Sequence, residues 1–389
     1  MHFVLVAGEA SGDVLGARLM DALRHCRGEG VEFSGIGGRM MAARGLASLF
    51  PIGDLSVMGL AEVLPRLPLL LRRLGEAAAH VRRVRPDAVV TIDSPGFSFR
   101  LAKRLRGDGV PLIHYVAPQL WAWRPGRARH IAQRIDHMLA LLPFEPAFFA
   151  EYGLDCEFVG HPVVEGVAEA PGDGAAFRHR HGIATDAPVV ALLPGSRQSE
   201  TSRLLPVFTA AVTLLRQRRP ELRVVMPTVE QVAPTVAAAA RGLHPAAVVV
   251  EDLDERADAF AAANAAVAAS GTVSLELALR RVPAVVAYRA NALTAALVRR
   301  LLKVPNVALP NILAGRRVMP ELLQEHCRPE PIAAALQGLL DDEAGRREQI
   351  GALTEIAEML GAGGEAPSLR AAKAVLKVLD DRHAAATKG

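Results

Sequence analysis

The chain has 389 residues, which is long enough for two domains of ordinary size. Hydrophobic residues make up 51% of it and aromatic residues only 4%, so Ala, Leu and Val must fill the core. The formal net charge is +4, and almost all of the positive charge is arginine. A codon bias toward Arg and Ala would produce this excess, and arginine also suits phosphate groups and anionic surfaces.

The three cysteines, Cys26, Cys156 and Cys327, are scattered and fit neither a disulfide framework nor a metal or redox motif. They favour a reducing compartment. The N-terminus has the pattern of a strand rather than of a signal peptide. No uninterrupted apolar run reaches the ~18–20 residues of a membrane span. We therefore expect a cytoplasmic protein that can touch a membrane surface.

Short apolar, β-branched runs alternate with helical patterns, which predicts parallel, doubly wound sheets and an α/β fold. The predicted strands cover residues 3–7, 32–36, 88–92, 112–116 and 138–142, and then 189–193, 222–226, 246–250, 265–268 and 284–287. Residues 160–182 are rich in Gly, Pro and small side chains and are expected to connect two domains. A last helix, over residues 368–381, need not pack on the second domain.

The first turn, in VLVAGEASGD, joins a buried strand to a helix as in many nucleotide-binding proteins. It carries Glu9 and Asp13, however, where a phosphate loop normally avoids carboxylates. We expect Ser11 and Asp13 to cap the helix that follows. PVVALLPGSRQSE opens the second series in a similar way, and both turns should line a cleft at the carboxyl ends of the strands.

The stretch LLPGSRQSE is the better candidate for a phosphate site. Gly195 permits close backbone approach, Ser196 offers a hydrogen-bond donor, and Arg197 offers a bidentate fork. A strand that ends in Pro-Gly is also a common turn, so the pattern by itself leaves that alternative open.

The stretch ASGTVSLELAL has the same character. Ser270, Gly271 and Thr272 form a small-residue turn into a helix, whose N–H groups and positive dipole end favour an anion. The Glu276 carboxylate, one turn further, could accept hydrogen bonds from two ribose hydroxyls. The alternative is that Ser270 or Thr272 is the helix N-cap and Glu276 a solvated side chain.

Asp93 follows a buried strand in VVTIDSPGFSF and is expected to face the cleft. Its carboxylate could accept a proton from a hydroxyl group there. Capping of the next helix is the alternative. Trp121 and Trp123 lie beside Arg124; they could contact a sugar or an acyl chain, although core packing is favoured for at least one of them. The arginines near them would suit a substrate phosphate or an anionic membrane.

Residues 54–74 are apolar with arginines on the fringe, which fits either a segment in the lipid interface or an ordinary core helix. Its two prolines predict that no single helix covers the stretch. His179 and His181 resemble a pair of metal ligands, but no carboxylate or cysteine completes a site, so a solvated loop is predicted.

Nine motifs occur in order: AGEASGD, VMGLAEVL, IDSPGFSF, HYVAPQLWAWRPGR, LLPFE, FVGHP, LLPGSR, SGTVSLE and LPNILAG. With them the chain resembles the lipid-A-disaccharide synthase family, bacterial glycosyltransferases of the GT-B architecture, over nearly its whole length. The resemblance implies two Rossmann-like, doubly wound domains that face each other across a cleft. Residues 1–165 would bind the acceptor and residues 166–362 the UDP-sugar. The helix in residues 363–389 would pack on another domain or subunit.

The resemblance also implies a reaction. UDP-2,3-diacylglucosamine would donate its sugar to the 6-hydroxyl of 2,3-diacylglucosamine 1-phosphate. The products would be UDP and a β-1′,6-linked disaccharide 1-phosphate, so the anomeric centre is inverted. Members of the family need no metal, and no cofactor is expected. Both substrates carry two acyl chains, which favours the interfacial interpretation of residues 54–74, at the cytoplasmic face of the inner membrane.

The family's motifs assign roles to individual residues. Asp93 would be the base, with Glu9 in reserve, and Gly96 stands where many relatives carry a second acid. The nucleotide and donor side would comprise Gly195, Ser196, Arg197, Ser270, Gly271, Thr272, Glu276 and Asn311. The acceptor and lipid side would comprise Ser11, Met58, Trp123 and Arg124.

Other functions fit less well. A UDP-N-acetylglucosamine 2-epimerase of the same fold is the alternative, and it would need no acceptor. A Rossmann dehydrogenase is disfavoured because neither turn reads G-x-G-x-x-G. A two-domain binding protein would normally carry a secretory signal. No nucleic-acid partner is expected, and a homodimer is left open.

Overall fold

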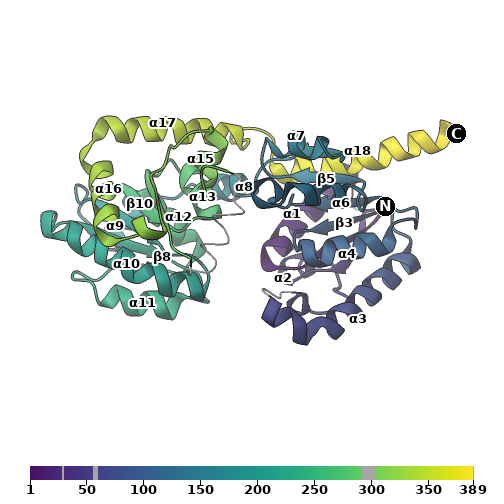
Figure 1. Ribbon diagram of the computed structural model, residues 1–389, viewed down its shortest axis with the longest axis horizontal. Coiled ribbons are helices and arrows are strands. Elements are labelled where there is room, and N and C mark those ends of the chain that lie inside the picture. Colours follow the sequence, from purple (N-terminus) through teal and green to yellow (C-terminus); the bar gives the residue numbers. More distant parts are fainter. Residues whose placement is uncertain (29, 56–59, 291–303, 389) are drawn as a thin grey trace. The chain divides into compact units, whose positions relative to one another are not determined.

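The computed structural model describes residues 1–28, 30–55, 60–290 and 304–388, and these form two compact units. Unit 1 consists of Met1–Pro162 and Gly364–Gly389, and unit 2 of Val163–Gly363 (Figure 1). The division expected from the sequence fell after residues 165 and 362. Each unit is built on one six-stranded sheet in which every strand pair is parallel.

The strands of unit 1 lie in the order β2-β1-β3-β4-β5-β6. Their bounds are β1 His2–Ala7, β2 Glu32–Ile36, β3 Ala88–Ile92, β4 Leu112–Tyr115, β5 His137–Ala140 and β6 Cys156–Phe158. Every residue of β3 and β4 is buried, as is typical of central strands covered by helices on both faces.

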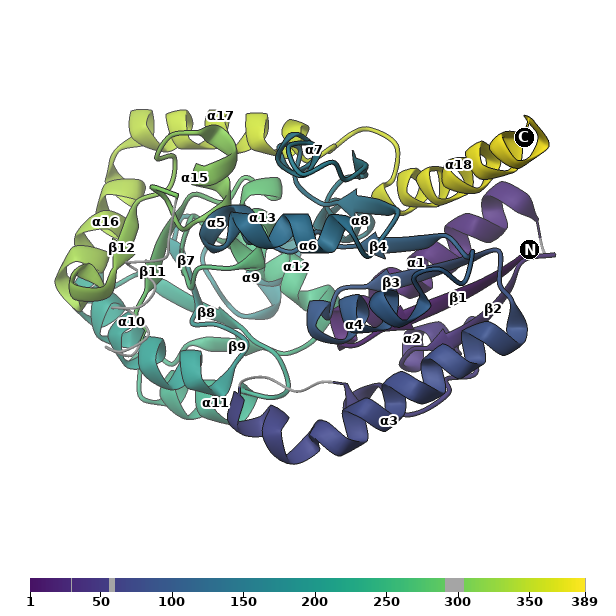
Figure 2. The ribbon, with the colours of Figure 1, turned by 45° about the vertical axis from the view of Figure 1, so that its right-hand side comes forward.

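The helices of unit 1 form a layer on each face of the sheet, which Figure 2 shows. They are α1 Ala10–Arg27, α2 Arg39–Ala42, η1 Ile52–Asp54, α3 Leu60–Val84, α4 Pro95–Leu105, α5 Leu120–Trp123, η2 Pro125–Arg127, α6 Ala128–Ala132, α7 Glu145–Ala150 and α18 Pro367–Lys388. α1 and α18 share one apolar core with the sheet, while α3, α4, α6 and α7 share the other. The helix near the end of the sequence therefore completes unit 1.

Unit 2 repeats the plan, with strands in the order β12-β11-β10-β7-β8-β9. These are β7 Val189–Leu193, β8 Arg223–Pro227, β9 Val248–Val250, β10 Ala265–Ala268, β11 Ala284–Tyr288 and β12 Glu321–Leu323. The helices are α8 Val163–Glu169, α9 Gly174–Arg180, α10 Gln198–Arg218, α11 Ala233–Arg241, α12 Leu253–Ala262, α13 Thr272–Leu279, α15 Leu309–Ala314, η3 Gln324–His326, α16 Pro329–Asp341 and α17 Glu343–Met359.

The α/β fold predicted from the sequence is confirmed, and each of the ten predicted strands is present within about two residues of its bounds. The sequence missed β6 and β12. Both have three residues, lie at the edge of a sheet and are half-buried, so they carry no continuous apolar run.

The interpretation of residues 160–182 as a connection was wrong for most of the stretch. Two helices of unit 2, α8 and α9, lie within it. Two of its glycines allow close packing, because a Cβ on Gly172 or Gly174 would lie 2.2 or 2.5 Å from a carbonyl oxygen of α12. The φ of Gly172 is also +86°, a conformation that favours glycine.

The two prolines do not interrupt a helix as predicted, although α3 covers only residues 60–74 of the stretch 54–74. Pro65 and Pro68 both lie inside α3, which runs unbroken from Leu60 to Val84. Both prolines are exposed, so water can bond the carbonyl groups that lack an N–H partner. Further along, Leu74 and Val81 pack into the core and hold the helix in place.

Asp13 does not cap α1, as the sequence had suggested. It is only 5% exposed and accepts hydrogen bonds from three backbone N–H groups at the start of α2. Those of Gly38 and Met41 reach Oδ1 at 2.7 and 3.1 Å, and that of Met40 reaches Oδ2 at 2.9 Å. α1 itself has no side-chain cap. Sequence spacing could not reveal a partner 25 residues away.

We expect Asp13→Ala to lower the free energy of unfolding by about 3 kcal/mol, because three backbone N–H groups lose a buried, charged acceptor. Asp21→Ala is the matched control on the same helix. It removes an ion pair with Arg44 in which Asp21 is half-exposed, and should change that free energy by less than about 1 kcal/mol. Urea denaturation of both variants measures the difference. Equal losses would contradict the capping role.

Candidate functional site

In an open parallel sheet, ligands bind at the carboxyl ends of the strands, where the strand order reverses. In unit 1 this switch point lies between β1 and β3, because the chain passes from β1 to β2 on one side and then crosses to β3 on the other. Glu9 lies in the turn after β1, Ser11 in the first turn of α1, and Asp93 in the turn after β3. The topology therefore brings together candidate residues that are far apart in the sequence.

The two turns pack closely against each other. A Cβ on Gly8 would lie 2.4 Å from both Cβ and Oγ of Ser94, and one on Gly12 would lie 3.3 Å from the carbonyl oxygen of Ile92. The small residues of AGEASGD thus permit contact between two strand ends. Close packing therefore explains these small residues without a bound phosphate, which agrees with the presence of carboxylates in this segment.

Asp93 is half-buried at the end of β3, and its φ of +52° is followed by a φ of +46° at Ser94. Two successive residues in the left-handed region cost free energy and are found mostly where function requires them. The Asp93 carboxylate accepts a hydrogen bond from the backbone N–H of Ser94 at 2.8 Å and one from the Ser11 hydroxyl at 3.5 Å. No hydrogen bond supports the alternative that Asp93 caps α4.

The other candidate residues of this edge have fewer contacts that point to a role. Glu9 is partly buried, and its carbonyl oxygen accepts the hydrogen bond from the N–H of Asp13 that opens α1. Gly96, where the resemblance led us to expect a second acid, is exposed, and a Cβ there would meet no atom within 4 Å. Space would therefore permit an acid at that position. Met58 lies outside the described residues.

The two tryptophans differ in their surroundings. The Trp121 indole donates a hydrogen bond to Glu145 at 3.1 Å. Its ring is nearly perpendicular to the Phe144 ring, with 4.9 Å between the ring centres, so Trp121 is the tryptophan with a packing role. Trp123 is 39% exposed, and the guanidinium of Arg124 lies 4.6 Å from the centre of its ring. This exposed pair can contact a ligand.

Glu145 was not singled out from the sequence, although it stands in the LLPFE motif. Its side chain accepts three hydrogen bonds and is almost wholly buried. Burial raises the pKa of Glu145 to about 7, because the loss of water outweighs the hydrogen bonds that favour the charged form. A pattern of residue types cannot show which acid of a turn points inward.

In unit 2 the switch point lies between β7 and β10. Leu193 pairs with Ala268, so the turn at residues 194–197 and the turn at 269–272 lie side by side. α10 and α13 begin directly after these turns, which places the positive ends of two helix dipoles at one edge. Ser196 and Arg197 are exposed there. This is the geometry of an anion site.

Arg197 faces a carboxylate that the sequence did not single out. Its Nη1 lies 3.5 Å from Oε1 of Glu200, and the Tyr288 hydroxyl donates a hydrogen bond to the same oxygen at 3.3 Å. Gly195 has a φ of +109°, and a Cβ there would lie 2.7 Å from the other Glu200 oxygen. The Arg197 side chain is 59% exposed, so an anion can reach its guanidinium.

Within the second turn, Ser270 does not cap α13, because its hydroxyl donates to the carbonyl oxygen of Val307 at 3.3 Å. The N-cap is Gly271, and Thr272 is exposed. Glu276 is not a solvated side chain, since it is only 18% exposed and forms ion pairs with Arg256 at 2.5 Å and Arg280 at 3.5 Å. These two arginines fix its orientation.

Asn311, which the sequence assigned to the nucleotide side, lies inside unit 2. It is wholly buried. Its Nδ2 donates to Met319 O and to Glu321 Oε1, and its Oδ1 accepts from the N–H groups of Val318 and Met319, all at 2.8 Å. These four bonds occupy the amide, so we assign it to holding the segment before β12.

The described residues contain no cluster of three or more His, Cys, Asp or Glu side chains that could hold a metal ion. His181 instead pairs with Glu255 at 2.9 Å at the end of α9, so the prediction of a solvated loop was wrong. Among the helices that the structure describes, none is long and apolar enough to cross a membrane.

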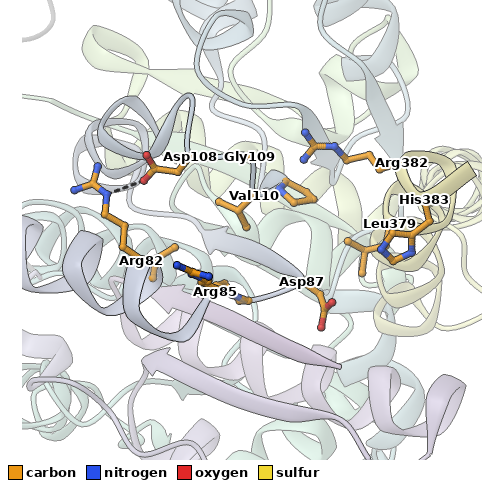
Figure 3. A pocket seen from close by; sticks show the side chains of 12 residues that line it. Arg82, Arg85, Asp87, Asp108, Gly109, Val110, Leu379, Arg382 and His383 are labelled. Atoms are coloured by element: carbon orange, nitrogen blue, oxygen red, sulfur yellow. Dashed lines mark hydrogen bonds and ion pairs between the residues drawn. The ribbon is translucent and has the colours of Figure 1, made fainter. Parts of the chain in front are cut away.

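A cavity of about 660 Å³ in unit 1 lies away from the switch point. It opens before β3 and β4, at their amino ends (Figure 3). Its charged lining comprises Arg82, Arg85, Asp87, Asp108, Arg382 and His383. This cavity is therefore separate from the candidate site at the carboxyl ends of the strands.

Known proteins match this chain over nearly its whole length. The family model described as lipid-A-disaccharide synthetase matches residues 3–374. The lipid-A-disaccharide synthase of Rhodospirillum centenum is 56% identical over 388 residues, covering 99% of this chain and 96% of the relative. That of Paramagnetospirillum magneticum is 52% identical over 380 residues, covering 97% of each.

Solved structures of low identity share the fold. UDP-GlcNAc 2-epimerase from Neisseria meningitidis, bound to UDP-GlcNAc, gives a TM-score of 0.64 at 12% identity, covering 98% of this chain and 100% of that one. Acinetobacter baumannii MurG gives a TM-score of 0.57 at 14% identity, covering 98% and 99%. Both likenesses concern the fold alone.

The contact between the two turns of unit 1 can be tested with a matched pair of glycines. Gly8→Ala should lower the free energy of unfolding by about 1–3 kcal/mol, because its Cβ would displace Ser94. Gly96→Ala lies two residues beyond Ser94 with open space around it and should change that free energy by less than about 0.5 kcal/mol. Similar urea midpoints for the two variants would contradict the packing described here.

Proposed function

The chain belongs to the lipid-A-disaccharide synthetase family and is a GT-B glycosyltransferase, and we propose that it joins two diacylated glucosamines. The donor is UDP-2,3-diacylglucosamine, and the acceptor is 2,3-diacylglucosamine 1-phosphate. The observation that carries the proposal is the arrangement of the two switch points, with Asp93 at one and two adjoining helix N-termini at the other.

Unit 1 is the acceptor side in this proposal, and Asp93 is the base. It takes the proton from the acceptor 6-hydroxyl as that oxygen attacks the anomeric carbon of the donor. The bond from that carbon to the diphosphate breaks, UDP leaves with the electron pair, and the anomeric centre inverts. Among the described residues no cation pairs with Asp93, so its carboxylate can accept the proton. Glu9 in the adjacent turn is the reserve base.

Unit 2 is the UDP-sugar side. The departing diphosphate needs positive charge, which Arg197 and the N–H groups at the starts of α10 and α13 can supply. Gly195, Ser196, Gly271 and Thr272 leave the backbone accessible there. Glu276, oriented by its two arginines, retains lone pairs for the ribose hydroxyls.

The lipid side includes Ser11, Trp123 and Arg124, with Met58 as a candidate outside the described residues. The early part of α3 supports contact with the cytoplasmic face of the inner membrane. Leu67 and Leu71 are 39% and 48% exposed beside arginines on the same helix, the composition of an interfacial helix. We propose a peripheral location, and leave a homodimer open.

A direct assay tests the function. The purified protein is incubated with the diacylated donor and acceptor, and the products are identified by mass spectrometry. UDP and disaccharide 1-phosphate are expected in equal amounts. Epimerisation of a UDP-sugar without formation of a disaccharide would favour the epimerase alternative and refute the transferase.

Asp93→Asn should lower kcat by roughly 10²- to 10⁴-fold, because an amide cannot accept the proton. The affinity for UDP should not change, since Asp93 belongs to the other unit. Steady-state rates and calorimetric titration with UDP measure the two effects. Near-normal turnover in Asp93→Asn together with loss of turnover in Glu9→Gln would move the base to Glu9.

Arg197→Ala should raise the Kd for UDP roughly 10- to 100-fold through the loss of a charged hydrogen-bond donor. Arg218→Ala is the control at the far end of the same helix, where the guanidinium bonds Gln337. Calorimetric titration compares them. If both variants bind UDP as the unmodified chain does, the diphosphate lies elsewhere.

A further inference from the structure

Glu145 takes no part in the transfer step, yet its buried carboxylate joins two segments at the carboxyl edge of the unit 1 sheet. It begins α7, just after β5. Oε2 accepts hydrogen bonds from the backbone N–H groups of Leu141 at 3.1 Å and Leu142 at 3.0 Å. Oε1 accepts the hydrogen bond from the indole of Trp121 in α5. The carboxylate therefore ties the turn after β5 to the segment after β4.

This tie continues a series of contacts that starts at the candidate base. The N–H of Asp93 donates to the carbonyl oxygen of Tyr115, at the end of β4, at 2.9 Å. The N–H of Val116 donates to the carbonyl oxygen of Leu139 in β5 at 3.1 Å. Val116 has a φ of +83°, which is strained for a β-branched residue. The ends of β3, β4 and β5 are thus held in register.

Trp121 fixes the short helix α5, which also carries the exposed Trp123. Its ring meets the edge of Phe144, and its N–H meets Glu145, so both its position and its rotation are fixed. Trp123 stands two residues later in the same four-residue helix, with Arg124 stacked on it. If Trp121 lost these contacts, α5 could rotate and change the positions of Trp123 and Arg124.

We propose that Glu145 is a positioning residue that holds α5, and with it Trp123 and Arg124, on the acceptor side of the site. This rests on the proposed function, which assigns that pair to the acceptor. Groups that are already ordered need not be ordered when the substrate binds, which improves acceptor binding and alignment. Glu145 acts through Trp121 and touches no substrate.

A carboxylate suits this place because all three neighbouring groups are donors. Above its raised pKa of about 7, Glu145 is ionised and has only acceptor sites, on both of its oxygens. In Glu145→Gln the amide NH₂ must face either the indole N–H or the two backbone N–H groups. At least one donor then loses its acceptor, although the size of the side chain is unchanged.

The test compares Glu145→Gln, Trp121→Phe and the double variant in the full chain, with Glu151→Gln as control. Glu151 is exposed directly after α7. Glu145→Gln and Trp121→Phe should each lower kcat/KM for the acceptor roughly 10- to 100-fold, mainly through KM. The double variant should be no worse than either single one. Glu151→Gln should be normal, and UDP affinity should be unchanged throughout.

Fluorescence provides a readout that does not depend on turnover. The chain has two tryptophans, so Trp123→Phe leaves Trp121 as the only one. In that background Glu145→Gln should shift the emission to longer wavelength, because water reaches the released indole, and Glu151→Gln should not. An unmoved emission would overturn the link to Trp121. Absence of disaccharide from the unmodified chain would instead overturn the proposed function, and the acceptor role with it.

Two kinetic outcomes would also overturn the proposal. One is that Glu145→Gln lowers kcat/KM for the acceptor by the same factor with and without Trp121→Phe, since Glu145 would then act independently of Trp121. The other is a parallel loss of UDP affinity, which would indicate general damage. If Glu145→Gln does not fold, Trp121→Phe decides, because it keeps an aromatic ring at this position and removes the indole N–H that Glu145 accepts; a normal acceptor KM would refute the proposal.

Discussion

The parallel pairing of β1 with β3 is the contact on which the candidate site of unit 1 depends. It fixes Val6 opposite Thr91 and Ala7 opposite Ile92, so the two turns that follow must share one small space. Only a residue without a Cβ fits at Gly8, and Asp93 enters the left-handed region beside it. In unit 2 the pairing of β7 with β10 has the same consequence for the turns that begin α10 and α13.

The acidic side chains at the carboxyl edges of the two sheets have different partners. In unit 1 each of three carboxylates has a different partner. Asp13 bonds the start of α2, Glu145 bonds Trp121 in α5, and Asp93 lies next to the hydroxyl of Ser11. In unit 2 the acids Glu200 and Glu276 are each matched with arginine. A proton acceptor suits the edge where a carboxylate lies next to a hydroxyl, and an anion site suits the edge where arginines and helix N-termini gather. This contrast agrees with the division of roles that we propose.

The sequence predicted the sheets well because central parallel strands are continuous apolar runs, and it placed Asp93 at a strand end for the same reason. It was wrong or silent where a partner is distant in the sequence. The role of Asp13 depends on α2, whose first bonded N–H is 25 residues away, and that of Glu145 on an indole 24 residues away. Residue type limits what a side chain can bond, but the fold decides which group it meets.

The return of the chain to unit 1 has a consequence for the order of folding. α18 supplies Ala371, Val375 and Leu379 to the core beside α1, yet these residues are synthesised after all of unit 2. On the ribosome, unit 2 can complete its own core while one face of unit 1 still exposes apolar side chains. Unit 1, although begun first, is finished last, and its uncovered face is where a nascent chain of this kind needs protection from aggregation.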